Sequence, residues 1–164
     1  MSTDTLTAVQ TENTADGMYF EDFREGDTGE SHEVEAERDA MIAYALAHDP
    51  WPIHTDEDFA KTTPAGGLTA SFGYVVSLFL DCVHTFETQR RPQTGFLGAL
   101  EWRIRFHEAV HPGDRLRVNY TVESTRLTSK RDRGVVTVQH KLLNQSGDVA
   151  IATDVVGMYL TRPR

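Results

Sequence analysis

A carboxylate and an imidazole lie five residues apart in the stretch His48-Asp49-Pro50-Trp51-Pro52-Ile53-His54. Each proline disfavours helix at the residue before it, so the backbone from Asp49 to Ile53 is predicted to be extended and stiff. Asp49 could act as a base, and His54 as a neutral donor or second base, toward one water molecule. Such a pair can equally serve as loop residues that cap a helix, so the spacing alone leaves catalysis open.

A long helix is predicted from Leu68 to Thr88, because apolar residues recur there at steps of three and four. Pro64-Ala65-Gly66-Gly67 comes directly before it. The free amides at a helix N-terminus can polarise a carbonyl or hold an anion, although the glycines can also simply let the chain turn sharply. No Lys-Ser or Lys-Thr follows the glycines, so this is no Walker-type phosphate loop.

The remaining elements are two short helices and a sheet. One helix is predicted over Ala36–Ala47, and a second begins after Thr55 as its N-cap, with acidic residues in the first turn. Beyond Gly95 the apolar period changes to two, which predicts four consecutive strands joined by hairpin turns in an antiparallel meander. These strands cover about 100–107, 116–122, 136–142 and 149–160. The fold class is therefore α+β, with the sheet wrapped around the long helix.

Composition limits the classes of partner. Sixteen Lys and Arg against twenty-five Asp and Glu give a formal net charge of −9, which argues against a nucleic-acid partner. The lone Cys82 excludes a disulfide within the chain, fits a reducing cytoplasm, and is expected to be structural because it lies in mid-helix. The histidines lack the spacing of metal ligands, so no metal is expected. No apolar run is long enough to cross a membrane, so a cytoplasmic protein without membrane contact is predicted.

The chain divides into a polar tail over residues 1–17 and one domain over residues 18–164. The tail lacks apolar periodicity and is expected to be disordered or loosely packed. Two basic clusters stand out in the acidic domain: Arg90-Arg91, and Lys130-Arg131 with Arg133. Each could meet the phosphates of a nucleotide-bearing ligand, or could be an ordinary solvated end of a hairpin.

The run from Tyr44 to Asp56 resembles the signature of MaoC-like dehydratases and (R)-specific enoyl-CoA hydratases. That signature is an aromatic residue, a short spacer, Gly-Asp, any residue, Asn-Pro, an aliphatic residue and His. Three further family motifs follow in the same order, so the resemblance covers roughly residues 18 to 162. They match Pro64–Ser71 at the entry to the central helix, Phe106–Asp114 in a strand and turn, and Asn144-Gln145-Ser146-Gly147 in a hairpin.

The resemblance implies a hotdog fold, in which a curved antiparallel sheet wraps a long central helix. It also implies a homodimer or higher homo-oligomer that binds an acyl-CoA thioester near the subunit interface. Asp49 would be the general base and His54 would orient the water, while the backbone amide of Phe72 or Gly73 would stabilise the enolate-like oxygen. No separate cofactor is implied, because coenzyme A is part of the substrate. The substrate-binding residues would be Trp51, Gly66, Gly67, Ser71 and the basic residues Arg90, Arg91, Lys130, Arg131 and Arg133.

The sequence departs from the family pattern at four positions. His48 replaces the glycine before the aspartate, Trp51 replaces the usual asparagine, and Ala109 replaces a proline. Phe72 stands where many members have the glycine whose amide polarises the thioester. The expected function is reversible addition of water to an enoyl-CoA. A non-catalytic acyl-CoA-binding hotdog module and a hotdog thioesterase are the alternatives, since Trp51 and Phe72 could crowd the site.

Overall fold

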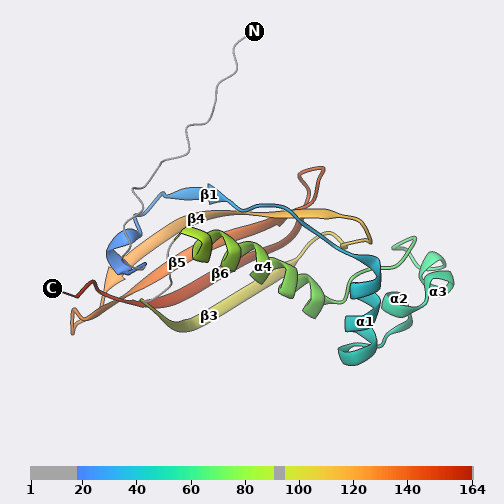
Figure 1. Cartoon of the computed structure of the whole chain (residues 1–164), viewed down its shortest axis with the longest axis horizontal. Coiled ribbons are helices and arrows are strands. Elements are labelled where there is room, and N and C mark those ends of the chain that lie inside the picture. The colour runs from blue at the N-terminus through green and yellow to red at the C-terminus, as the bar shows by residue number, and fades with distance from the viewer. Residues whose placement is uncertain (1–17, 91–94, 164) are drawn as a thin grey trace, which may run out of the picture.

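The computed structural model describes residues 18–90 and 95–163 (Figure 1). The predicted tail over residues 1–17 and Arg91 lie outside the described residues. The helices are η1 (Phe20–Asp22), α1 (Arg38–His48), α2 (Pro52–Thr55), α3 (Glu57–Lys61) and α4 (Phe72–Arg90). The strands are β1 (Thr28–Glu30), β2 (Val34–Glu35), β3 (Phe96–Phe106), β4 (Arg115–Leu127), β5 (Arg133–Leu143) and β6 (Val149–Leu160).

The strands form an antiparallel sheet in the order β1-β4-β5-β6-β3, with β2 paired to β4 off this path. The predicted meander is confirmed for β4, β5 and β6, but the prediction that β3 joins β4 by a hairpin is wrong. Strand β3 instead pairs with β6, with Phe106 opposite Ile151, and lies at the edge of the sheet. Alternation of apolar residues reveals a strand but not its neighbour, so the sequence pattern could not show this crossing.

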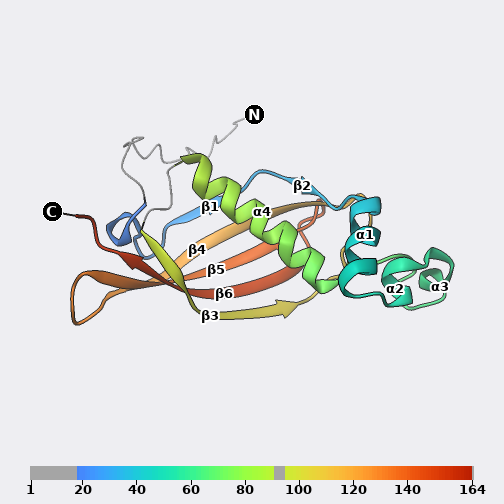
Figure 2. The same cartoon turned by 60° about the horizontal axis from the view of Figure 1, so that its bottom comes forward.

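Helix α4 lies across one face of the curved sheet, and this arrangement confirms the hotdog fold (Figure 2). The helix begins four residues later than the predicted Leu68. The residues before it are instead bound to other segments, since the amide of Thr69 donates to the Ile53 carbonyl at 3.3 Å and that of Ala70 to the Val110 carbonyl at 2.8 Å. In the described part of the chain, no helix is long and apolar enough to cross a membrane.

The core lies between α4 and the sheet. Phe79 is 1% exposed, and its ring contacts the rings of Trp102 on β3 and His140 on β5, with centroids 5.9 Å and 5.3 Å away. Cys82 follows Phe79 by one helical turn and is fully buried. Burial raises the pKa of the Cys82 thiol, which keeps it protonated and agrees with the expected structural role.

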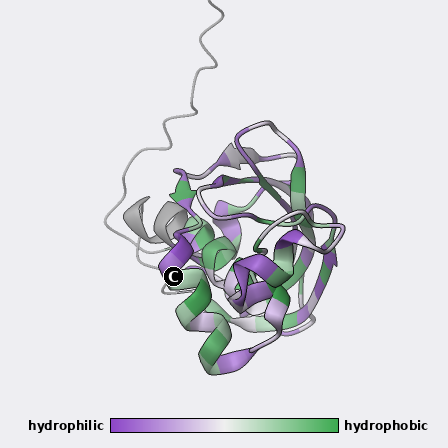
Figure 3. Cartoon of the chain, turned by 90° about the vertical axis from the view of Figure 1, so that its right-hand side faces the viewer, coloured by the Kyte–Doolittle hydropathy of each residue, from purple (hydrophilic) through white to green (hydrophobic). Residues whose placement is uncertain are grey.

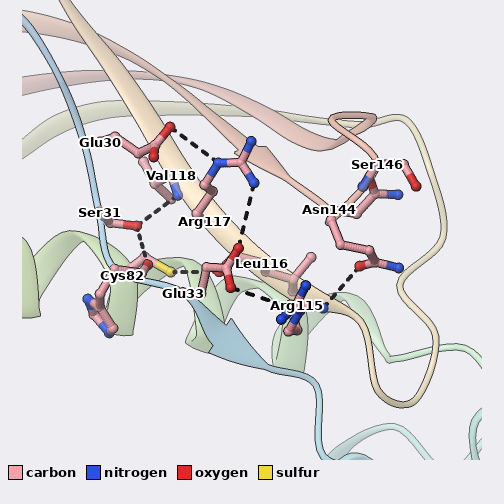
Figure 4. A network of polar contacts seen from close by, with 12 residues as sticks. Glu30, Ser31, Glu33, Cys82, Arg115, Leu116, Arg117, Val118, Asn144 and Ser146 are labelled. Carbon is pink, nitrogen blue, oxygen red and sulfur yellow. Dashed lines mark hydrogen bonds and ion pairs between the residues drawn. The ribbon is translucent and has the colours of Figure 1, made fainter. Parts of the chain in front are cut away.

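The segment that contains β1 and β2 was not predicted, because each of these strands is too short to show a period. It is attached to β4 by polar contacts (Figure 4). Ser31 accepts a hydrogen bond from the Val118 amide at 2.8 Å, and Arg117 lies 3.2 Å from Glu30 and 3.8 Å from Glu33. These contacts hold the N-terminal segment against the edge of the sheet farthest from β3.

Burial of His140 predicts a pH-dependent stability. Burial lowers the pKa of His140 to about 4 from the ordinary 6.5, so the unfolded chain binds a proton that the folded chain does not. Stability conferred by neutral His140 is complete above about pH 6.5 and is lost as pH falls toward 4, by about 3 kcal/mol in total. Urea unfolding of wild type and His140→Phe between about pH 7 and pH 4 measures this. The variant should lose about 3 kcal/mol less than wild type.

The exposed His32 provides the control. His32→Gln should keep the wild-type pH dependence, because it leaves His140 and its buried surroundings unchanged. An identical pH dependence for wild type and His140→Phe would contradict the assignment.

Candidate active site

Asp49 and His54 are positioned by the two prolines between them. Pro50 disfavours helix at Asp49, which becomes the C-cap of α1, and Pro52 occupies the first turn of α2, where its missing amide hydrogen costs nothing. His54 lies on that single helical turn. The prediction of an extended segment is therefore wrong beyond Trp51, because Pro52 begins a helix instead of only preventing one.

The N-cap of the next helix also differs from the prediction. Asp56, not Thr55, caps α3 by accepting a hydrogen bond from the Phe59 amide at 3.0 Å. The hydroxyl of Thr55 donates to the Trp51 carbonyl at 3.2 Å instead.

The helices α1 to α3 form a compact group at one end of the molecule. This end is turned toward the viewer in Figure 3, where hydrophobic and hydrophilic residues alternate along the three helices.

The side chains of Asp49 and His54 meet, as the sequence predicts. Asp49 Oδ2 lies 3.8 Å from His54 Nε2. On the other side of the ring, Nδ1 lies 2.8 Å from the Thr69 carbonyl oxygen. A carbonyl only accepts, so Nδ1 carries a proton. In the neutral form of the ring, Nε2 then keeps a lone pair toward Asp49. In that form two acceptors face each other, and a water molecule beside the pair could donate a hydrogen bond to both.

This pair opens into a cleft of about 290 Å³. The wall opposite the pair comes from the start of α4 and from the end of β3 with the residues that follow it. Phe72 contacts Phe106 edge-on, with ring centroids 5.7 Å apart, and remains 63% exposed, so the cleft stays open beside it. The lining residues are Asp49, His54, Ala70, Phe72, Val75, Phe106, His107, Glu108, Ala109 and Val110.

Four other predicted substrate-binding residues do not line the cleft. Trp51 is 67% exposed and does not crowd the pair. Gly66 has a φ of +71°, which a glycine adopts easily, so a role in the turn accounts for it. Gly67 follows it in open space. Ser71 is fully buried, and its hydroxyl lacks a hydrogen-bond partner among the described residues.

Arg90 and the basic cluster of Lys130, Arg131 and Arg133 lie at the other end of the molecule. Arg90 closes α4, whose nineteen residues place its two ends about 27 Å apart. Lys130 and Arg131 belong to the β4–β5 hairpin, and Arg133 begins β5, far from α1–α3 (Figure 1). Arg133 donates two hydrogen bonds to its neighbour Asp132, at 2.9 Å and 2.8 Å. Within one chain, the structure does not bring these residues to the Asp49–His54 pair.

Gly73, the second candidate for the amide that stabilises the oxyanion, has a clear packing role. A Cβ at this position would lie 2.6 Å from the hydroxyl oxygen of Tyr44 on α1. The glycine therefore lets α1 approach the first turn of α4. Phe72, one residue earlier, lines the cleft, and its amide belongs to the helix terminus, where N–H groups lack partners within the helix.

Sequence reasoning missed Thr69, which fixes the His54 tautomer, and His111, whose Nδ1 lies 2.9 Å from the Leu68 carbonyl oxygen. A backbone carbonyl leaves no trace in residue types, so Thr69 could not have been found that way. The Phe106–Asp114 motif was a signal for His107 to Val110, but only the fold shows that they line the same cleft as Asp49. Among the described residues, no group of three or more His, Cys, Asp or Glu could hold a metal ion.

Comparison with known proteins identifies the family. The family described as "MaoC like domain" matches residues 22–144, which is most of the chain. The chain belongs to the MaoC-like domain family. No curated protein matches it.

Solved structures agree with this membership. The chain is 29% identical to the MaoC-like dehydratase from Rhodospirillum rubrum, with a TM-score of 0.80 over 90% of this chain and 100% of that one. A monoamine oxidase regulatory protein from Archaeoglobus is 25% identical, with a TM-score of 0.78 over 90% and 97% of the two chains. An (R)-hydratase from Pseudomonas aeruginosa is 21% identical, with a TM-score of 0.66 over 89% and 88%, and shares the fold.

The close approach of Tyr44 to Gly73 predicts that Gly73→Ala destabilises this MaoC-like domain. Alanine ordinarily favours a helix over glycine by about 1 kcal/mol, so the opposite sign is diagnostic. Displacing Tyr44 should cost about 1–3 kcal/mol. Thermal unfolding measures the change. Gly67→Ala is the matched control, since a Cβ there meets nothing within 4 Å, and it should leave the midpoint nearly unchanged. Stabilisation by Gly73→Ala would contradict the packing role.

Proposed function

We propose that this MaoC-like protein catalyses the reversible addition of water to the double bond of an enoyl-CoA thioester. The observation that carries the proposal is the 3.8 Å approach of Asp49 Oδ2 and His54 Nε2 at one wall of the cleft. Asp49 Oδ2 accepts hydrogen bonds, and so does His54 Nε2 in the neutral ring. A water beside the pair would therefore donate one hydrogen bond to each and direct a lone pair into the cleft. Family membership and the dehydratase from Rhodospirillum rubrum support the same chemistry.

The proposed step is balanced within the site. The water oxygen bonds to the β-carbon of the enoyl group while Asp49 takes a water proton. A proton then passes from the Asp49–His54 pair to the α-carbon, so H and OH add across the double bond. The thioester oxygen carries negative charge in between. The amides of Phe72 and Gly73 at the N-terminus of α4 would stabilise that charge, with the helix dipole in the favourable direction.

Two features support catalysis over mere binding. Trp51 does not line the cleft, and the Phe72 ring packs edge-on against the Phe106 ring. Neither of these two bulky residues, which replace smaller ones of the family pattern, therefore closes the approach to Asp49. The Nδ1–Thr69 hydrogen bond also fixes the ring in the tautomer that can accept a water proton. No cofactor beyond the coenzyme A of the substrate takes part in the proposed reaction. The cytoplasmic location of the protein stays a prediction.

The test of this function is Asp49→Asn. The amide cannot take the water proton, so kcat/KM for hydration of short and medium enoyl-CoA esters should fall by about 10²–10⁴-fold. Loss of absorbance of the enoyl thioester measures the rate. Asp39→Asn is the matched control, because the Asp39 carboxylate is 99% exposed on α1 away from the pair, and it should keep the wild-type rate.

Three outcomes would contradict the proposal. Full activity of Asp49→Asn would exclude Asp49 as the base. Release of free thiol without hydration would indicate a thioesterase. Binding of acyl-CoA by calorimetry without turnover of any ester would indicate a binding module.

We further propose that the protein works as a homodimer joined along β3. This edge strand pairs only with β6 in the described chain, so its other side offers unpaired backbone groups to a second strand. A second copy related by a two-fold axis would pair with it antiparallel. The exposed large apolar side chains on β3 are Phe96, Leu97, Leu100, Trp102 and Phe106.

Such pairing would also bring the basic hairpin to the site. Antiparallel β3 strands place the start of one beside the end of the other, and the end of β3 at Phe106 lines the cleft. The start of β3 at Phe96 pairs with Tyr159, next to Leu160, which pairs with Arg133. The hairpin with Lys130, Arg131 and Arg133 in one copy would therefore approach the cleft of the other, where the coenzyme A phosphates need positive charge.

The double variant Leu97→Lys/Leu100→Lys tests the dimer. Two cations on the paired edge should separate the copies, so sedimentation should give twice 18.4 kDa for wild type and 18.4 kDa for the variant. Leu46→Lys on α1 is the control, since Leu46 is also exposed but lies away from β3, and it should remain dimeric. A monomeric wild type would overturn the proposed dimer.

A further inference from the structure

The residues that follow β3 bring a second carboxylate to the cleft. Glu108 lines the same cleft as Asp49. Its backbone is fixed in place, because the Glu108 amide donates to the Val149 carbonyl at 3.1 Å. Within the described residues, the Glu108 side chain forms no ion pair and no hydrogen bond. The cleft therefore has two carboxylates in its lining, and the Glu108 carboxylate has no basic partner that would neutralise it.

Nothing else in the lining offsets these negative charges. The other titratable groups are the imidazoles of His54 and His107, and the remaining lining residues are apolar. Among the described residues, no Lys or Arg lines the cleft. Arg105, the nearest arginine along the chain, is paired with Asp154 at 3.0 Å. An acyl group in the cleft therefore meets apolar surface and negative charge.

The cleft is small enough for these charges to act on any group inside it. Its volume of about 290 Å³ equals that of a sphere about 8 Å across, which is about the Debye length at physiological salt. Salt therefore screens such interactions little, and apolar walls strengthen them by lowering the local dielectric constant. A second carboxylate on the acyl group would be repelled by Asp49 and by Glu108, and it would lose hydration without gaining a counter-charge.

We infer that Glu108 is a specificity-determining residue that excludes acyl groups with a second carboxylate, so that the substrates are enoyl-CoA esters with an uncharged acyl chain. This rests on the proposed function, because it names the class of ester that the Asp49–His54 site takes. Asp49 is required for the reaction of every ester. Glu108 has no step in that reaction, so its charge acts only on the choice of substrate.

The experiment compares trans-2-pentenoyl-CoA with the same ester carrying a carboxylate in place of its terminal methyl group. It is run at about pH 8, where imidazole side chains are uncharged. Wild type should hydrate the neutral ester with a kcat/KM about 100-fold higher, with about 10-fold from each carboxylate of the cleft. Glu108→Gln, which keeps the shape of the side chain, should reduce this ratio about 10-fold. Glu108→Lys should reduce it about 10-fold further, because attraction then replaces repulsion.

Glu123→Gln is the matched control. Glu123 is exposed on β4 and does not line the cleft, so removal of its charge should leave the ratio at the wild-type value. Both esters carry the same coenzyme A and use the same base. Any effect of a variant on phosphate binding or on Asp49 therefore cancels in the ratio.

Calorimetry with the two saturated esters separates this inference from the proposed function. If neither enoyl ester is hydrated, but pentanoyl-CoA binds wild type more tightly than its carboxylated counterpart and Glu108→Gln reduces that difference, the function fails and the selectivity stands. Equal kcat/KM of wild type for both enoyl esters would overturn the inference and leave the function intact. A ratio unchanged in Glu108→Gln, with a wild-type unfolding midpoint, would overturn the inference as well.

Discussion

The end of this MaoC-like protein that holds the Asp49–His54 pair depends on three backbone groups just before α4. The Thr69 carbonyl accepts the Nδ1 proton of His54, the Leu68 carbonyl lies 2.9 Å from His111 Nδ1, and the Ala70 amide donates to Val110. Through these bonds, residues 68–70 join α2, the crossing that follows β3, and the first turn of α4. The ring tautomer, the cleft wall and the position of the helix terminus therefore share one short segment, and a shift in it would disturb all three.

This constraint explains why part of the site could be predicted and part could not. The Asp49–His54 pair was predicted from its spacing together with the resemblance to MaoC-like dehydratases, and the prolines that position it are visible in the sequence. The hydrogen bond of His54 to Thr69 uses a backbone carbonyl, which every residue has, so the residue type at position 69 does not predict it. Prediction of the fold was limited in the same way. The helical period predicted α4, but two of its first four predicted residues, Thr69 and Ala70, donate hydrogen bonds to Ile53 and Val110 instead, and only the tertiary structure supplies these partners.

The sequence also could not predict how far the basic residues lie from the site, or which polar residues meet in the core. The basic residues Lys130, Arg131 and Arg133 are visible as a cluster, but their distance from Asp49 depends on which end of the sheet each hairpin occupies. His140 reads as an ordinary inward position of a strand, and only the register shows that it faces Thr153. A pattern along one strand gives the face of a residue, whereas a site needs neighbours on other strands.

The strand order has a consequence for the order of folding. Strands β4, β5 and β6 follow one another through short turns, so their pairing closes only small loops. Pairing of β3 with β6 joins segments separated by the whole of β4 and β5, so we expect this more distant contact to form more slowly. The apolar edge at β3 is then expected to be completed late, when a second chain can already meet it. Assembly of two copies would then be part of the final folding step, and it would remove from solvent the one edge that is most prone to aggregate.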